Sequence, residues 1–148
     1  MSEMLSPHFS LAELTASDTA ARQGIDNMPP PDVLETLKHT AVGLEAVRAL
    51  LGAPLHVSSG YRCPALNKLV GGQPKSAHCL GEAADFVAPQ FGSCEQIVAR
   101  LVASGLTFDQ VILEFPKSAS GGWVHISFNG RIRRQALVID KGGVWPWQ

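Results

Sequence analysis

A long amphipathic segment is the sequence feature that most constrains the fold of this chain. Over residues 32–51, apolar side chains recur with a period close to 3.6, which predicts a helix with one apolar face. Asp32 and Glu35 form a capping-box pattern at its start, and Gly52 follows its end. Because the apolar face must pack against another element, the rest of the chain has to supply an apolar surface. The apolar positions are Val33, Leu34, Leu37, Ala41, Leu44, Val47 and Leu51.

Two further helices are predicted from capping boxes. Ser10 with Glu13 starts a short helix near residues 10–16. Ser93 with Gln96 starts a second helix, which Gly105 ends. The segments 24–31 and 60–75 contain repeated Gly or Pro residues and are expected to be loops.

Strand patterns follow the long helix. The segments 110–115 and 123–128 are separated by a loop of Pro, Lys, Ser, Ala and Gly, which predicts an antiparallel hairpin. Because helices come first and strands mostly later, an α+β fold is favoured over a doubly wound parallel sheet. The expected strands are 55–59, 83–88, 110–115, 123–128 and, as the last one, 135–140.

The chain length and composition indicate one globular unit. With 148 residues, 45% of them apolar, and no repeat or linker, we expect a single domain over residues 1–148. A helical N-terminal part occupies about residues 8–52, a second part about 53–140, and a short tail follows. This Trp-rich tail, 142–148, is expected to pack against the domain.

The charge pattern excludes several classes of partner. The net charge is −1 and the cluster Arg131, Arg133, Arg134 is short, so it is interpreted as a solvated strand edge and no nucleic-acid partner is expected. No apolar run of about 18 residues occurs, so no membrane partner is expected either. The first residues lack a secretory-signal pattern, which predicts cytoplasmic synthesis without a signal peptide. The three cysteines lack C-x-x-C spacing and do not indicate a disulfide framework.

The strongest chemical signal is the string from Ser76 to Asp85. It places His78 before a glycine turn and Asp85 inside the following strand, so that both side chains can point at one spot. A third ligand is available from His125, in the middle of the segment 123–128. Two histidines and one carboxylate are typical of a catalytic zinc site, which keeps a fourth position for water. Asp85 also lies in an apolar strand, where a carboxylate without a partner costs several kcal/mol.

The same residues resemble the zinc D-alanyl-D-alanine carboxypeptidase/endopeptidase family over about residues 8–140. Its superfamily includes the lysostaphin-type peptidases and the hedgehog signalling domain. The resemblance implies an α+β fold with an antiparallel sheet and helices packed on one side. It also implies one zinc ion per chain, held by His78, Asp85 and His125. The matching strings are Ser59-Gly-Tyr-Arg62, Val70-Gly-Gly72, Ser76-x-His78-x-x-Gly81-x-Ala-x-Asp85 and Trp123-Val-His125-Ile-Ser127.

The resemblance also implies substrate contacts. Arg62 matches the arginine that faces the water and the substrate carbonyl, and a guanidinium can stabilise an oxyanion there. Ser76 is expected to hydrogen-bond near the ligands or the substrate, and Gln110 is a candidate for binding substrate. Without the resemblance, Arg62 and Ser76 would be ordinary loop residues.

The general base departs from the family patterns. Some members carry a glutamate three residues before the last histidine, and others a histidine two before it, but here these positions are Gly122 and Trp123. Glu114 is the candidate for the base, because its strand pairs with the His125 strand and its apolar setting would raise its pKa. Glu82 is the second candidate. If Glu114 faces solvent, it has no such role.

The expected function is zinc-dependent hydrolysis of peptide bonds in peptidoglycan stem peptides. Both a D-Ala-D-Ala carboxypeptidase and an L-Ala–D-Glu type endopeptidase agree with these residues, and the small size resembles phage endolysins, which reach the wall after release. A virion component that opens the wall locally has the same chemistry. The alternative is a zinc-containing module that binds peptidoglycan or protein without catalysis. The sequence does not indicate an oligomeric state.

Overall fold

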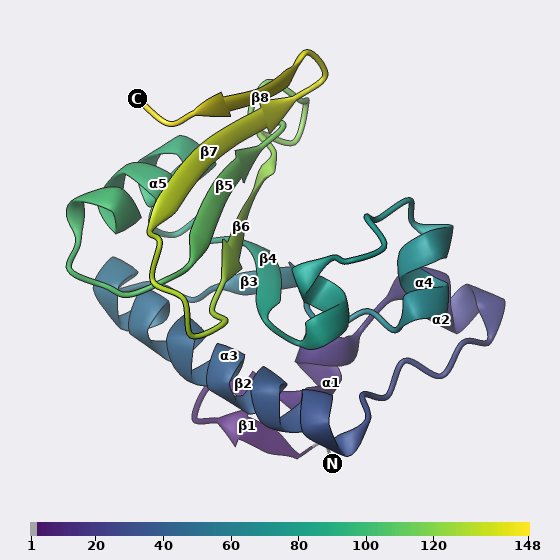
Figure 1. Cartoon of the computed structure of the whole chain (residues 1–148). Coiled ribbons are helices and arrows are strands. Elements are labelled where there is room, and N and C mark those ends of the chain that lie inside the picture. Colours follow the sequence, from purple (N-terminus) through teal and green to yellow (C-terminus); the bar gives the residue numbers. More distant parts are fainter. Residues whose placement is uncertain (1–2) are drawn as a thin grey trace.

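The long helix is present as α3, Pro31–Leu51, in the computed structural model, which describes residues 3–148 (Figure 1). The predicted capping box at Asp32 is wrong. The N-cap is Pro30, which makes no side-chain hydrogen bond, and Pro31 occupies the first helical position. Proline suits that position because its φ is already helical and its missing N–H has no intrahelical partner anyway. The buried face contains Leu37, Thr40, Ala41, Leu44, Val47 and Leu51.

Both remaining capping boxes mark real helices. Ser10 accepts a hydrogen bond from Glu13 N at the start of α1, Leu11–Thr15, and Ser93 and Gln96 cap α5, Cys94–Ala103, reciprocally. One segment expected to be loop contains a helix, α4, Pro64–Leu69, which again begins with proline at its first position. Two further short elements are α2, Asp18–Gln23, and the 3-10 helix η1, Ala77–Leu80.

A six-stranded sheet has the strand order β3-β4-β6-β5-β7-β8, and a separate hairpin, β1-β2, lies at the N-terminus (Figure 1). The predicted hairpin is confirmed, since β5 and β6 pair antiparallel. The tail contains an additional strand, β8, so the segment 135–140 is not the last strand. The strands are β1 Met4–Ser6, β2 Phe9–Ser10, β3 His56–Ser59, β4 Ala83–Val87, β5 Gln110–Glu114, β6 Trp123–Ser127, β7 Gln135–Asp140 and β8 Gly143–Pro146.

The α+β class is confirmed, but the sheet is mixed rather than antiparallel. After β6, the connection 128–134 carries the chain past β5, so that β7 pairs with β5 in parallel. Arg134 stabilises this crossover: it adopts a positive φ of 49° and donates to the carbonyl groups of Leu101, Ser104 and Leu106 at the end of α5. The interpretation of the arginine cluster as a solvated edge is therefore wrong for Arg134, because its guanidinium caps a helix.

The two faces of the sheet have different surroundings. Alternation along β5 and β6 directs Val111, Leu113, Val124 and Ile126 into the hydrophobic core, and α3 and α5 contribute to the same core. The alternate residues of the same strands point to the opposite face, where the polar side chains gather. Among residues 3–148, no helix is both long enough and apolar enough to cross a membrane.

Candidate metal centre

Strand register brings Asp85 and His125 together. In the antiparallel pairing of β4 with β6, Asp85 lies directly opposite His125. Directly opposed residues have their side chains on the same face, with Cβ atoms about 5 Å apart. The chain neighbours of Asp85, Ala84 and Phe86, point into the core and hold β4 in place. Two residues 40 positions apart in sequence therefore share one spot.

His78 reaches the same spot through a tight turn. It belongs to η1, which ends at Gly81 with a positive φ of 75°. A Cβ on Gly81 would lie 2.9 Å from Val33 O, so only glycine fits this turn against α3. Thr40 donates from its hydroxyl to Gly81 O at 2.6 Å, which fastens the turn to the long helix.

The donor atoms of these three residues form a cluster. Asp85 Oδ1 lies 3.2 Å from His78 Nε2 and 3.0 Å from His125 Nδ1, and the ligand atoms all lie within 4.8 Å of one another. Bonds of about 2.0–2.1 Å to a tetrahedral zinc place neighbouring ligand atoms about 3.3 Å apart. The spacing therefore fits the group that the sequence motif implies.

The tautomer of His78 supports a cation at this position. His78 Nδ1 lies 2.7 Å from Gly60 O, and because a carbonyl only accepts, Nδ1 carries the hydrogen. In a neutral ring, Nε2 then presents a lone pair to Asp85 Oδ1. Two lone pairs in contact need a proton or a metal ion between them. A backbone acceptor on the other ring nitrogen is also how metal-binding histidines are usually oriented.

Asp85 is 8% exposed, and its surroundings keep it ionised. Burial alone would raise its pKa, but the hydrogen bonds and the positive charge that His125 and His78 supply when protonated outweigh burial and hold the pKa well below its ordinary value. A carboxylate that stays ionised while buried is suited to bind a cation.

Arg62 and Ser76 lie at the edge of this cluster. They line a cavity of about 350 Å³ that also contains the three candidate ligands. Arg62 Nη2 donates to Ser76 Oγ at 3.4 Å, whereas Arg62 Nε is buried without a partner among residues 3–148. Ser76 Oγ also accepts from His78 N at 3.2 Å. The guanidinium therefore has donor capacity left for a ligand in the cavity, and Ser76 holds both Arg62 and the η1 turn.

Glu114 lines the same cavity, but it does not lie directly opposite His125. Ile112 is directly opposite His125, and Glu114 is opposite Trp123, so Glu114 and His125 are diagonal neighbours. Trp123 Nε1 donates to Glu114 Oε2 at 2.7 Å. Burial, and then the negative charge of Asp85, raise the pKa of Glu114 above its ordinary value.

The two remaining candidates, Gln110 and Glu82, lie in different surroundings. Gln110 lines the cavity, and its side chain donates to Gln135 Oε1 at 2.7 Å. Glu82 is not among the cavity residues. Its charged neighbours are Arg131 and Asp109, and burial raises its pKa. The structure therefore gives no support to Glu82 as the base.

Asn27 was not identified as a site residue from the sequence. Its buried amide donates from Nδ2 to Thr15 O and Tyr61 O and accepts at Oδ1 from Cys63 N, with distances of 2.9, 3.0 and 2.8 Å. Tyr61 and Cys63 flank Arg62, so Asn27 fastens the segment that carries the guanidinium. In the sequence, Asn27 lies in a Pro-rich loop, where an asparagine is ordinarily interpreted as a turn residue.

The comparison with protein families agrees with this geometry. A family model described as Peptidase M15 matches residues 7–127, a segment that contains all three candidate ligands. The chain belongs to the Peptidase M15 family, the group of zinc-dependent D-Ala-D-Ala carboxypeptidase-like proteins that its motifs resemble. A search of curated proteins finds no match to the chain.

Proposed function

We propose that this chain is a zinc-dependent peptidase that hydrolyses peptide bonds in peptidoglycan stem peptides. The observation that carries the proposal is the meeting of His78, Asp85 and His125 in a cavity that also exposes Arg62 and Glu114. These two further residues offer a fixed positive charge and a carboxylate of raised pKa, which peptide hydrolysis needs next to a metal.

His78 Nε2, Asp85 Oδ1 and His125 Nδ1 would hold the ion, since these are the atoms that face one another. When bound, zinc supplies a Lewis acid that polarises a carbonyl and lowers the pKa of a coordinated water to about 7. One zinc per chain is expected.

Glu114 is proposed as the general base. It accepts a proton from the attacking water and later delivers it to the leaving amine. Trp123 binds one carboxylate oxygen of Glu114, and the other has no partner among residues 3–148, so it is available for this transfer. Arg62 is proposed to stabilise the negative charge that develops on the carbonyl oxygen. Ser76 and Gln110 remain candidates for substrate contacts.

The reaction could remove the terminal D-alanine or cut between L-Ala and D-Glu, and both bonds belong to the proposed substrate class. Synthesis in the cytoplasm and later access to the wall, as for phage endolysins, is part of the proposal. Stem peptides are its proposed partners, with neither nucleic acid nor membrane expected among them.

The test is digestion of purified peptidoglycan by the zinc-loaded protein, with identification of new termini by mass spectrometry. Release of D-alanine indicates the carboxypeptidase, and a new N-terminus on D-Glu the endopeptidase. A chelator should abolish either product, and added zinc should restore it. If the protein binds the wall but produces no new terminus under any condition, the proposal is wrong. The chain would then be a zinc-containing binding module.

A further inference from the structure

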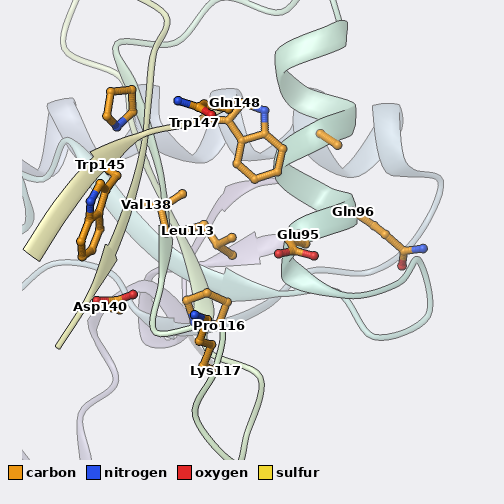
Figure 2. Close-up of a pocket in the computed structure, with 12 residues that line it drawn as sticks. Glu95, Gln96, Leu113, Pro116, Lys117, Val138, Asp140, Trp145, Trp147 and Gln148 are labelled. Atoms are coloured by element: carbon orange, nitrogen blue, oxygen red, sulfur yellow. The ribbon is translucent and has the colours of Figure 1, made fainter. Parts of the chain in front are cut away.

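A groove outside the metal centre is formed by α5, the strands next to it and the C-terminal tail. Its cavity volume is about 790 Å³. Figure 2 shows Glu95 and Gln96 of α5 across from Trp145, with Leu113 and Val138 between them. Leu113 belongs to the core-facing set of β5, so this groove lies on the face of the sheet opposite the metal centre.

Two tryptophans of the tail line the groove. Trp145 is 46% exposed, although it is a large aromatic residue in an ordered strand. Trp147 N donates to Ala136 O at 2.9 Å, and its side chain packs partly on the core. The backbone pairing therefore holds the segment that carries both rings at a surface, and contiguous exposed apolar patches mark interaction sites.

The polar groups of the groove are available to a ligand. Glu95, Lys117 and Gln148 line it and have no side-chain partner within residues 3–148. Asp140 uses one carboxylate oxygen, Oδ1, to accept from Gly142 N at 2.7 Å. Side chains that donate and accept hydrogen bonds beside aromatic rings suit a ligand with apolar faces and polar edges.

A second hollow extends the groove. Its cavity volume is about 530 Å³, it shares Lys117 and Asp140 with the first, and it includes Phe115 and Lys141. The side chains of the two hollows include two acids, Glu95 and Asp140, and two lysines, so the side-chain charges balance. A surface whose side chains carry no net charge does not favour a polyanion and fits a neutral chain.

We propose that this groove binds a glycan strand of β-1,4-linked N-acetylamino sugars. Sugar rings have an apolar C–H face that stacks on indole, and their hydroxyl and acetamido groups hydrogen-bond to carboxylates and amides. The proposal rests on the proposed function, because stem peptides are attached to such strands. Asp140, Trp145 and Trp147 lie beyond the segment that the family model matches.

The direct test is titration of the full chain with a hexamer of N-acetylglucosamine, measured by calorimetry. Trp145→Ala should weaken binding at least tenfold, and Glu95→Ala by about threefold. Val144→Ser is the matched control: Val144 is 58% exposed on the same strand but does not line the groove, so its affinity should stay within twofold. Circular dichroism confirms folding of each variant. Absence of hexamer binding by the parent protein, or equal binding by Trp145→Ala, overturns the proposal.

A second readout separates this proposal from the proposed function. Trp145→Ala should cleave a glycan-free stem peptide at the parental rate and intact sacculi at least fivefold more slowly. If the parent protein cleaves neither substrate, the proposed function fails, while the titration still reports on the groove. If the groove instead binds a second copy, sedimentation will show a dimer that Trp145→Ala dissociates and the hexamer does not, and the glycan proposal is then wrong.

Discussion

Two buried aspartates, Asp85 and Asp109, have opposite surroundings. Asp109 is 1% exposed and receives hydrogen bonds from Arg133 Nε and Nη2 at 2.6 and 2.8 Å and from Asn129 Nδ2 at 2.8 Å. Among residues 3–148, the side-chain partners of Asp85 are two imidazoles, at 3.2 and 3.0 Å, one of which faces it with a lone pair when neutral. In the described part of the chain, Asp109 has a permanent cation, the guanidinium of Arg133, and Asp85 has none.

This difference shows how a structural carboxylate can be told from a ligand. Burial costs both groups solvation, and each needs a positive partner. Where the partner is a side chain of the same chain, the carboxylate contributes to folding. Where the neighbours are imidazoles around a cavity, without a permanent positive charge, the partner has to come from outside. Substitution of Asp85 should therefore affect metal binding, and substitution of Asp109 should affect stability.

The largest effect is expected for Asp85→Asn. Loss of the anionic ligand should weaken zinc binding more than about a hundredfold and reduce peptidase activity at least about a thousandfold. The zinc-free variant should unfold within about 1 kcal/mol of the zinc-free parent, because it loses no ion pair with a fixed charge. Elemental analysis and chemical denaturation measure the two properties. A full equivalent of zinc in the purified variant would remove Asp85 from the ligand set.

Glu114→Gln should show the next largest effect and leave the metal in place. The amide cannot accept the proton, so we expect turnover to fall about 10²- to 10⁴-fold. Because Glu114 is not in the ligand set, zinc content should stay at one equivalent. Turnover and elemental analysis on one preparation test both points. A variant that keeps parental turnover would show that the base is a different group.

Asp109→Asn should lower the stability of the protein and leave zinc binding and activity unchanged. The amide loses the charge-assisted pair with Arg133, and we expect the free energy of unfolding to fall by about 2 kcal/mol. Zinc stoichiometry and the activity of the folded fraction should be unchanged. Asp26→Asn is the control, since Asp26 is exposed in a loop, and its effect should stay within about 0.5 kcal/mol. Equal stability of the two variants in urea would contradict the structural role of Asp109.

The smallest expected effect is the change with pH in the stability difference between the parent protein and Asp109→Asn. The Arg133 hydrogen bonds, opposed by burial and aided by Asn129 and the arginine charges, lower the pKa of Asp109 to about 2. The unfolded value is about 3.9, so the carboxylate contributes its stability fully above about pH 4 and loses it as the pH falls toward 2. Urea unfolding of the parent and Asp109→Asn from pH 6 to pH 2 should give curves that converge in acid. A constant gap would mean that ionisation of Asp109 does not account for the difference.

Local signals predicted much of the fold. The 3.6-residue period of α3, the capping boxes of α1 and α5 and the β5–β6 hairpin depend on neighbouring residues, so they are visible in a single sequence. The parallel pairing of β5 with β7 is not visible in the sequence, because the order of the strands depends on which edge of the sheet is unpaired when the connection 128–134 reaches it. The helix α4 was missed because Pro64, which starts it, was interpreted as a loop residue.

The candidate site, too, could be predicted from local sequence patterns only in part. The spacing of His78, Asp85 and His125 indicated a shared centre, which the structure assembles. The register of Glu114 could not be derived, because it depends on the conformation of the loop. Phe115 has a positive φ of 51°, and a Cβ on Gly122 would lie 2.1 Å from Glu114 O. These two residues set the loop and thereby place Glu114 opposite Trp123. The contacts of Asn27 join segments that are distant in sequence, so no local pattern indicates them.

The crossover between β6 and β7 has a consequence for the order of folding. Arg133 binds Asp109 at the start of β5, and Arg134 binds the carbonyls that end α5, so both anchors must exist before the crossover can settle. We therefore expect β7 and β8 to acquire protection from hydrogen exchange after the β5–β6 hairpin, which pulse labelling during refolding would measure. The tail would then be the last segment to become ordered, and the tryptophan surface would form only after the strands that carry the histidine and aspartate cluster.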